Sequence, residues 1–322
     1  MLSRHFLRSK VLQSLYAYTI SESDDLNVIE KNFLHNIERL NDLGITQMST
    51  LLYFFDFSKK CMEEAKTKFL PSKEEVNPNM RFVENKFLVE LSNNYELKKA
   101  IESLKLNWSN HNDLFRTLYN SFRASEVYAK YMAAEVTDFK ADRELVLHLF
   151  KHIMNYEALV DIFYERNLFW EDDFYQIAQY NYGLLKSFDE EFSAASVFPR
   201  VFDKRNEQEV EACDFASVLL KKTILSFNEN TEIIKQNLKE WEYERVALMD
   251  ILIIKMAITE LVTFSSIPEK VTINECIELS KEYSTDKSKL FVNGILDKIY
   301  NELRSQGKIK KSGRGLIDES LL

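Results

Sequence analysis

The sequence has few residues that interrupt helices. Only 6 Gly and 4 Pro occur among 322 residues, far below ordinary usage. Glycine supplies left-handed backbone and proline fixes the backbone in turns, so their scarcity predicts long helices joined by short connections. Hydrophobic residues make up 45% of the chain, with 23 Phe and 15 Tyr, which is enough for a large core. The composition therefore predicts an all-α fold.

The sequence also lacks the marks of a secreted or membrane protein. It has 3 cysteines, far apart and without a CxxC pair, which predicts a reducing compartment and no disulfide framework. No signal-like segment begins the chain, and no apolar run is long enough to span a bilayer. The most apolar stretch, 246–261, is interrupted by Asp250 and Lys255, so it predicts a buried central helix. We expect a cytoplasmic protein without membrane contact.

Common catalytic and cofactor motifs are missing. The sequence contains no GxxxxGK[ST], GxGxxG or GxSxG, and no segment assembles a nucleophile, a base and an oxyanion site. His148 and His152 stand four residues apart with Glu144 one turn earlier, a spacing that can hold a metal ion on a helix. They lie opposite the apolar stripe of their helix, where surface histidine pairs are common. We therefore expect no enzyme, no cofactor and no metal, and keep a metal-dependent enzyme as a minor alternative.

Hydrophobic residues recur at helical spacing along most of the chain. The expected helices include 3–20, 26–40, 143–166, 211–238 (whole or broken) and 243–264. Gly44 is expected to end the second helix or lie just beyond it. No convincing internal repeat is present.

Two polar motifs predict the starts of the last helices. Thr272 and Glu275 have the spacing of a capping box, in which each side chain bonds the backbone N–H of the other residue. The turn 284–286 is expected to start a final helix that ends near Arg304. The basic tail beyond it is expected to be loose.

Charge argues against a nucleic-acid coat overall but leaves room for a local basic site. The formal charge is −9 and the pI about 5.3. However, Arg4, His5, Arg8 and Lys10 open the chain with no acidic residue before Glu22. Cations at a helix N-terminus oppose the macrodipole by roughly 0.3–1 kcal/mol each. The placement hints at an anionic ligand such as a phosphate backbone, and a solvated helix end is the alternative.

The final helix contains a glycine that needs a reason. Glycine inside a helix costs about 1 kcal/mol relative to alanine, so Gly294 predicts close approach of a neighbouring helix or of a bound chain. Asn293 beside it offers donor and acceptor groups. Phe291 is placed either to stack on an unpaired base or to join the core in line with Ile295 and Ile299.

Three segments of the chain carry distinctive motifs. Two are C-terminal, IPEKVTINECIELSK (267–281) and SKLFVNGILDKI (288–299), and follow an apolar helix ending in Glu-Leu at 261. The third is the first helix, which reads RHFLRSKVLQSLY (4–16). These segments resemble the NusB family of transcription antitermination factors, whose first helix has an Arg-rich start and a Gln-x-Leu-Tyr motif. The resemblance covers about 1–40 and 209–303, and the middle of the chain has no counterpart in short family members.

The resemblance implies two small helical bundles with a large helical insertion. The expected parts are 1–41 (first two helices of the N-terminal bundle), 42–207 (insertion), 208–240 (third helix of that bundle), 241–304 (C-terminal bundle) and 305–322 (flexible basic tail).

The resemblance also implies a function. Family members bind the boxA segment of nascent ribosomal RNA together with NusE, which doubles as a small-subunit ribosomal protein, and join an antitermination complex with NusA, NusG and RNA polymerase. Matched by position, the RNA-binding residues are Arg4, His5, Arg8, Lys287 and Phe291, and the partner-binding residues are Asp250 and Asn293.

Two departures from the family pattern put RNA affinity in question. Phe6 stands where a further basic residue can occur, and Lys287 replaces a frequent acid. A helical interaction scaffold with weak or no RNA binding is therefore the alternative function. Fusion to a ribosomal RNA methyltransferase, known for NusB-like modules, is excluded by the scarcity of glycine and of strand patterning.

Overall fold

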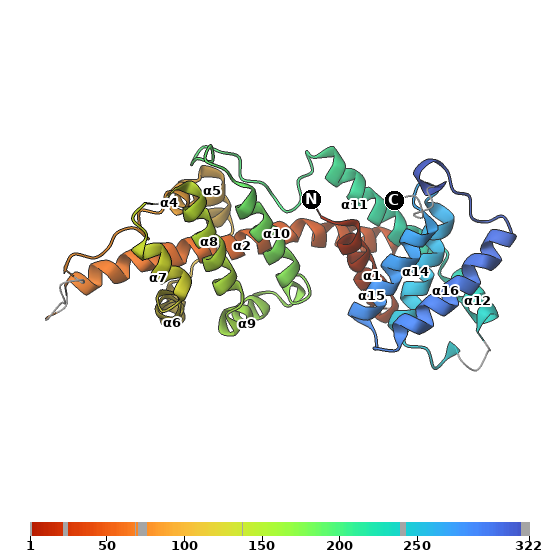
Figure 1. Cartoon of the computed structure of the whole chain (residues 1–322). Coiled ribbons are helices and arrows are strands. Elements are labelled where there is room, and N and C mark those ends of the chain that lie inside the picture. Colours follow the sequence, from red (N-terminus) through yellow and green to blue (C-terminus); the bar gives the residue numbers. More distant parts are fainter. Residues whose placement is uncertain are drawn as a thin grey trace. The chain divides into compact units, whose positions relative to one another are not determined.

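The fold is entirely helical wherever the structure describes it, which confirms the all-α prediction (Figure 1). The computed structural model describes residues 2–21, 25–67, 69, 76–136, 138–238 and 243–316. Within these ranges there is no strand, and no helix has both the length and the apolar character needed to cross a bilayer.

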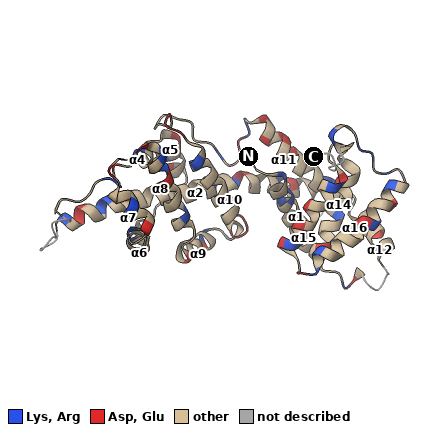
Figure 2. Cartoon of the chain, viewed as in Figure 1, with Lys and Arg blue, Asp and Glu red and all other residues tan. Residues whose placement is uncertain are grey.

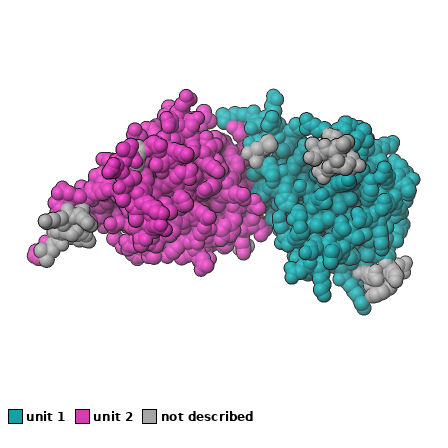
Figure 3. Space-filling model, viewed as in Figure 1, with its two compact units in different colours: residues 1–37, 204–322 teal, residues 38–203 magenta. Residues whose placement is uncertain are grey.

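The chain divides into two compact units, drawn in different colours in Figure 3. Unit 1 contains residues 1–37 and 204–322, and unit 2 contains residues 38–203. The helix α2 (Leu26–Lys66) is a single helix of 41 residues that contributes to both units. The expectation that this helix ends near Gly44 is therefore wrong, because Gly44 lies inside it.

Unit 1 is built around one apolar helix, α14 (Leu248–Thr263), every residue of which from Asp250 to Leu261 is buried. The helices that pack on it are α1 (Arg4–Ser21), α11 (Glu207–Leu225), α12 (Phe227–Asn237), α15 (Glu269–Tyr283) and α16 (Ser288–Ser305). The predicted central helix is confirmed, although it begins at Leu248 rather than near 243. The segment 211–238 is broken, at Ser226, as one of the two expectations had it.

Lys255, a buried cation of α14, is satisfied by partners on α12. The Nζ of Lys255 donates to the carbonyl of Phe227 at 3.0 Å and to the hydroxyl of Thr231, and it lies 3.2 Å from the centroid of the Phe227 ring. Burial lowers the pKa of Lys255 to about 8, with a smaller contribution from Lys235. The lysine therefore stays in the interior without a carboxylate.

Unit 2 surrounds its part of α2 with shorter helices. They are α4 (Lys86–Asn93), α5 (Tyr95–Ser103), α6 (Asn112–Arg123), α7 (Glu126–Ala133), α8 (Phe139–Met154), α9 (Glu157–Arg166) and α10 (Phe174–Ser187). Its core is rich in aromatic rings that meet edge to face, for example Phe54 with Phe82 and with Phe122. The stripe predicted as one helix over 143–166 is two helices, because Asn155 caps the end of α8.

The predicted capping box is also wrong. The helix α15 begins directly after Pro268, so Thr272 and Glu275 both lie within it. The Thr272 hydroxyl donates to the Glu260 carboxylate at 2.8 Å, and the Glu275 carboxylate contacts His5. Both side chains therefore hold neighbouring helices instead of capping their own.

The basic tail is docked along part of its length, contrary to the expectation that it is loose. The backbone N–H of Ser312 donates to the carbonyl of Ser265 at 3.0 Å, and the Nζ of Lys311 donates to the carbonyl of Phe264 at 3.0 Å. Gly315 is buried, and a Cβ there would overlap the Ser265 carbonyl oxygen. The last six residues, 317–322, lie outside the described residues.

Two glycines of unit 2 provide a matched test of its packing. A Cβ on Gly44 would lie 2.8 Å from Cγ2 of Val201, whereas a Cβ on Gly183 in α10 would meet nothing within 4 Å. We predict that Gly44→Ala lowers the free energy of unfolding by about 1–3 kcal/mol through overpacking against a stiff side chain. Gly183→Ala should raise it by up to about 1 kcal/mol through helix propensity. Urea unfolding of both variants checks this, and shifts of the two midpoints in the same direction would contradict it.

Candidate functional site

A buried ion pair joins the first helix to the centre of unit 1. The Arg8 guanidinium donates through Nε to Oε2 of Glu260 at 2.7 Å and through Nη2 to Oε1 at 2.6 Å. The two side chains are 1% and 0% exposed. Burial disfavours the charged guanidinium, but its hydrogen bonds to the Glu260 carboxylate and the negative charge of that group outweigh burial and raise the pKa of Arg8. This bidentate pair, supplemented by the hydroxyl of Thr272, fixes α1 on α14 and α15.

His5 extends this network to the surface. Its Nδ1 lies 2.8 Å from the Glu275 carboxylate, and its Nε2 lies 3.0 Å from the Glu282 carboxylate. Hydrogen bonding to Glu275, with a further contribution from Glu282, raises the pKa of His5 to about 9 against the effect of burial. In turn, the hydrogen bond from His5 lowers the pKa of Glu275, and nearby Arg8 adds to the effect. The imidazole is therefore charged at neutral pH, with both N–H groups directed at carboxylates.

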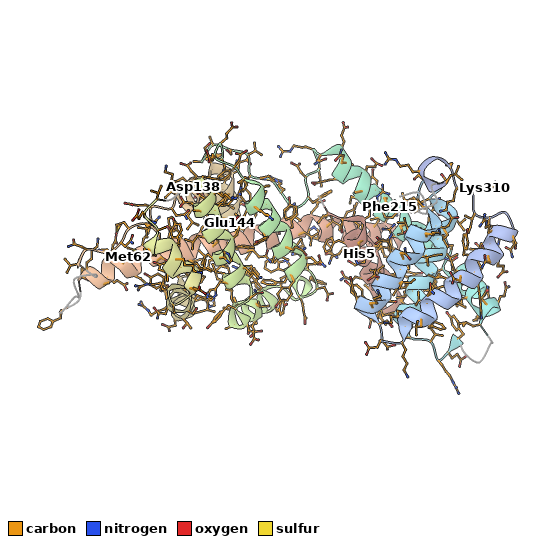
Figure 4. The ribbon with its side chains drawn as sticks, in the orientation of Figure 1. His5, Met62, Asp138, Glu144, Phe215 and Lys310 are labelled. Atoms are coloured by element: carbon orange, nitrogen blue, oxygen red, sulfur yellow. The ribbon has the colours of Figure 1, made fainter. Side chains whose placement is uncertain are left out.

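The ring of Phe215 on α11 lies against the guanidinium groups of the two arginines of α1. The guanidinium carbons of Arg4 and Arg8 lie 5.4 and 5.1 Å from its ring centroid, and the ring itself is buried. Figure 4 labels His5 and Phe215 on their two helices. Such cation–π contacts orient a guanidinium without using its N–H donors.

Arg4 and Arg8 therefore differ sharply in what they offer to a ligand. Arg4 is exposed and forms no hydrogen bond or ion pair with any residue in the described part of the chain, so its five N–H donors are available. Arg8 is buried on Glu260. The expectation that the Arg8 side chain contacts RNA directly is not met, because such a contact would have to break a desolvated ion pair.

The candidate residues near the start of α16 are also of two kinds. Lys287 and Asn293 are exposed, and Phe291 is half-buried. Asp250 is buried, and its Oδ2 accepts a hydrogen bond from the Ser288 hydroxyl at 2.8 Å. The expectation that Asp250 faces a protein partner is therefore not met, because the side chain is directed at the first turn of α16.

Gly294 differs from what its position in a helix predicted. A Cβ there would meet no described atom within 4 Å, so no helix in the described part of the chain approaches closely, and that expectation is wrong. The expectation that a bound chain approaches Gly294 stays a prediction. Leu290 on the same helix is 74% exposed, which leaves an open surface with both apolar and polar groups.

The structure joins some of the candidate residues and keeps others apart. His5 and Arg8 meet through Glu275, whose Oε2 lies 3.5 Å from Nη1 of Arg8. No hydrogen bond or ion pair between described residues connects these two with Lys287 or Phe291. Basic and acidic residues are interspersed along the helices of both units (Figure 2), so the exposed cations are local features.

Sequence reasoning missed the carboxylates that organise this site. Glu260 is buried within an almost wholly apolar helix, and a charge in such a position requires a partner of opposite sign. The buried position of Glu260 could be predicted from the sequence, but the sequence does not identify which cation pairs with it. Glu275 was assigned to a helix cap, and nothing in the local sequence indicated Glu282 as a second partner of His5.

The histidine pair of unit 2 does not form a metal site in the structure. No group of three His, Cys, Asp or Glu side chains within the described ranges is arranged to hold a metal ion. Nε2 of His152 lies 2.9 Å from the Ser121 hydroxyl, and its ring packs on Phe122. Glu144 and His148 are exposed.

Comparison with known proteins places the chain near one family. Residues 174–301 match the model of the NusB family. The chain is 44% identical over 104 residues to the transcription antitermination protein NusB of Salinibacter ruber, and 43% identical over 110 residues to that of Chloroherpeton thalassium. These alignments take 32% and 34% of this chain. The family match begins within unit 2, at the start of α10, and does not include residues 1–40.

The alignments cover only part of this chain and only part of each relative. The chain spans 65% and 52% of the lengths of these two relatives, less than two thirds in each case. A third relative, NusB of Natranaerobius thermophilus, is 35% identical over 89 residues, which are 28% of this chain and 64% of that protein. No solved structure matches the chain.

Removal of Arg8 should be far more costly than removal of Arg4. We predict that Arg8→Met lowers the free energy of unfolding by about 3–5 kcal/mol, because Glu260 is left buried without a partner. Arg4→Met, the exposed control, should change it by less than about 0.5 kcal/mol. Denaturant unfolding measures both. The double variant Arg8→Met/Glu260→Met should lose less than the two single variants together, and strict additivity would show that the pair is not coupled.

The His5 contacts should make stability depend on pH. A histidine whose pKa rises on folding stabilises the folded state below its unfolded value of 6.5 and loses that contribution as pH passes about 9. We therefore predict that wild type exceeds His5→Gln in stability at pH 6, and that the difference shrinks between pH 6.5 and 9.5. Thermal unfolding across this range tests the idea. A difference that does not change with pH would contradict it.

Proposed function

We propose that this chain, whose residues 174–301 match the model of the NusB family, is a cytoplasmic transcription antitermination factor that binds boxA RNA of nascent ribosomal RNA together with NusE. In this role it joins NusA, NusG and RNA polymerase and promotes processive transcription of ribosomal RNA. We propose no enzymatic step and no cofactor for it.

The proposal rests on one observation, that the Arg4 guanidinium is exposed and its N–H donors are not used by any described residue. Its guanidinium is exposed at the N-terminus of α1, oriented by the Phe215 ring and not matched by any carboxylate of a described residue. A cation in that position opposes the helix dipole, so its placement is better explained by a ligand than by stability. A phosphate group is the simplest anion that fits a planar guanidinium with all its donors available.

His5 and Arg8 support this contact without making it. Both cations are committed to Glu260, Glu275 and Glu282, so they offset two of three negative charges that would otherwise repel a phosphate backbone. Arg8 also holds α1 in place, and therefore holds Arg4 over Phe215. We assign both residues a positioning role.

The first turns of α16 are proposed as the second contact region. Lys287 is exposed and has no partner among the described residues, which suits a phosphate. Phe291 is half-buried, so one part of its ring is available for stacking on an unpaired base. Asn293 and the open surface at Gly294 are proposed to receive the protein partner, NusE. Asp250 contributes indirectly by fixing Ser288 at the start of this helix.

One observation favours a second candidate function, a helical interaction scaffold with weak RNA binding. Three carboxylates of Glu260, Glu275 and Glu282 surround two cations at the first helix, and the whole chain carries a charge of −9. If the acidic surroundings dominate, NusE-like protein binding would persist while RNA affinity is low. Salt dependence separates the two, since phosphate contacts give a steep slope.

The test is binding of a boxA-containing RNA to the full chain, with and without NusE, at several salt concentrations. We predict tighter binding with NusE, and a loss of roughly tenfold in affinity for Arg4→Ala and for Phe291→Ala. Each lost phosphate contact should reduce the salt slope by about 0.7 on a single strand. Lys31→Ala on α2 is the control, because Lys31 is an exposed lysine of unit 1 away from the proposed residues. RNA affinity that is equal for wild type and Arg4→Ala, even with NusE, would refute the proposed site.

A further inference from the structure

Unit 2 contains a cavity that the proposed antitermination function does not use. It encloses about 360 Å³ between α2, α5, α10 and the segment 198–201, and all of its lining residues belong to unit 2. This volume is within the range of small-ligand sites. The lining combines aromatic, amide and charged side chains.

The walls of the cavity are fixed by specific contacts. The Asn41 side chain forms two hydrogen bonds with the backbone of Phe202, at 2.9 and 3.1 Å. The Glu96 carboxylate accepts the backbone N–H of Phe198 at 2.9 Å. Gly44 allows Val201 to lie against α2, where any larger residue would collide with it. The segment 198–202 is thus held to both α2 and α5, and the cavity is preformed.

The charged side chains around the cavity differ in whether their hydrogen-bonding groups are already used within the protein. Of the two carboxylates, Glu96 holds the Phe198 backbone and Asp42 is likewise engaged within the protein. The two cations, Lys99 and Arg200, are exposed, and neither side chain forms a hydrogen bond or ion pair with a described residue. The two positive and two negative side chains balance in formal charge, but only the cations keep N–H donors that no described residue uses, so an anionic group is the expected partner of these donors.

Asn181 supplies a polar group of fixed orientation in the wall. It is 2% exposed, and its Nδ2 donates to the carbonyl of Gly44 and to Oε1 of Gln47, each at 3.0 Å. Both donors are thereby committed, so the amide cannot turn over without losing two hydrogen bonds. The amide oxygen accepts no hydrogen bond from any residue in the described ranges and remains as an acceptor for a ligand N–H.

Tyr95 adds an aromatic surface at the same cavity. Its ring is 69% exposed, while its backbone N–H is fixed on the carbonyl of Ala194 at 3.0 Å. An exposed ring next to two unpaired cations is the combination that binds a base and its phosphate.

We propose that this cavity binds a nucleotide unit. The base stacks on Tyr95 and donates an N–H to the Asn181 oxygen, and the phosphate contacts Lys99 and Arg200. The unit can come from a free mononucleotide or from a single-stranded RNA. The site lies in unit 2 and does not depend on the proposed boxA contacts of unit 1.

The experiment is calorimetric titration of the full chain with AMP, GMP, CMP and UMP, with ribose 5-phosphate and inorganic phosphate as base-free probes. We expect a nucleotide to bind more tightly than either base-free probe. Tyr95→Ala and the double variant Lys99→Ala/Arg200→Ala should each weaken binding roughly tenfold or more. Lys98→Ala is the matched control, because Lys98 is exposed on the same helix but does not line the cavity. All exchanged side chains are exposed, so the fold should be retained.

A short single-stranded oligonucleotide distinguishes the source of the nucleotide. It is titrated in an Arg4→Ala/Lys287→Ala background, so that failure of the proposed boxA contacts does not affect the result. If the oligonucleotide binds and the mononucleotides do not, the ligand is an RNA strand. If the mononucleotides bind, the ligand is a free nucleotide. The proposal is overturned if neither binds, if ribose 5-phosphate binds as tightly as the nucleotides, or if Lys98→Ala weakens binding as much as the cavity variants.

Discussion

The arrangement of unit 1 depends on one desolvated ion pair, between Arg8 of α1 and Glu260 of α14. A charge buried alone in an apolar helix is strongly unfavourable, and Glu260 is tolerated because a planar guanidinium meets it with two hydrogen bonds. The pair sets the position of α1. Arg4 lies one turn earlier on the same face of α1, at the exposed end of the helix over Phe215. This geometry underlies the proposal that Arg8 holds α1 in place while Arg4 contacts RNA.

Composition and periodicity were sufficient for the helical fold and for the buried central helix, because scarce glycine and a long apolar run act on every element alike. Predictions from them were wrong where one long-range contact determines the local structure. Gly44 was predicted to end a helix, yet it lies inside α2, where the missing Cβ leaves room for Val201. Thr272 and Glu275 have capping-box spacing, yet Pro268 begins the helix earlier and frees both side chains for other helices. Local patterns cannot weigh such long-range partners.

The candidate site shows the same limit. A basic first helix indicates an anion, but helical spacing alone does not say which arginine faces the interior. That distinction required the position of Glu260, which lies 252 residues away in the sequence. The cavity of unit 2 was equally hidden. It is assembled from α2, α5, α10 and a loop, and no short motif marks such a combination. In both proposed sites, the cations assigned a contact are those whose donors no described residue uses, whatever their residue type.

The central claim is that the surface beside the buried pair, and not the pair itself, contacts RNA. Hydrogen–deuterium exchange of the full chain, with and without boxA RNA and NusE, tests it most directly. The account predicts slower exchange in the first turn of α1 and in 287–294 when RNA and NusE are added, with little change in the already protected amides of α14. Unchanged exchange in both segments, or protection confined to residues 38–203, would contradict it.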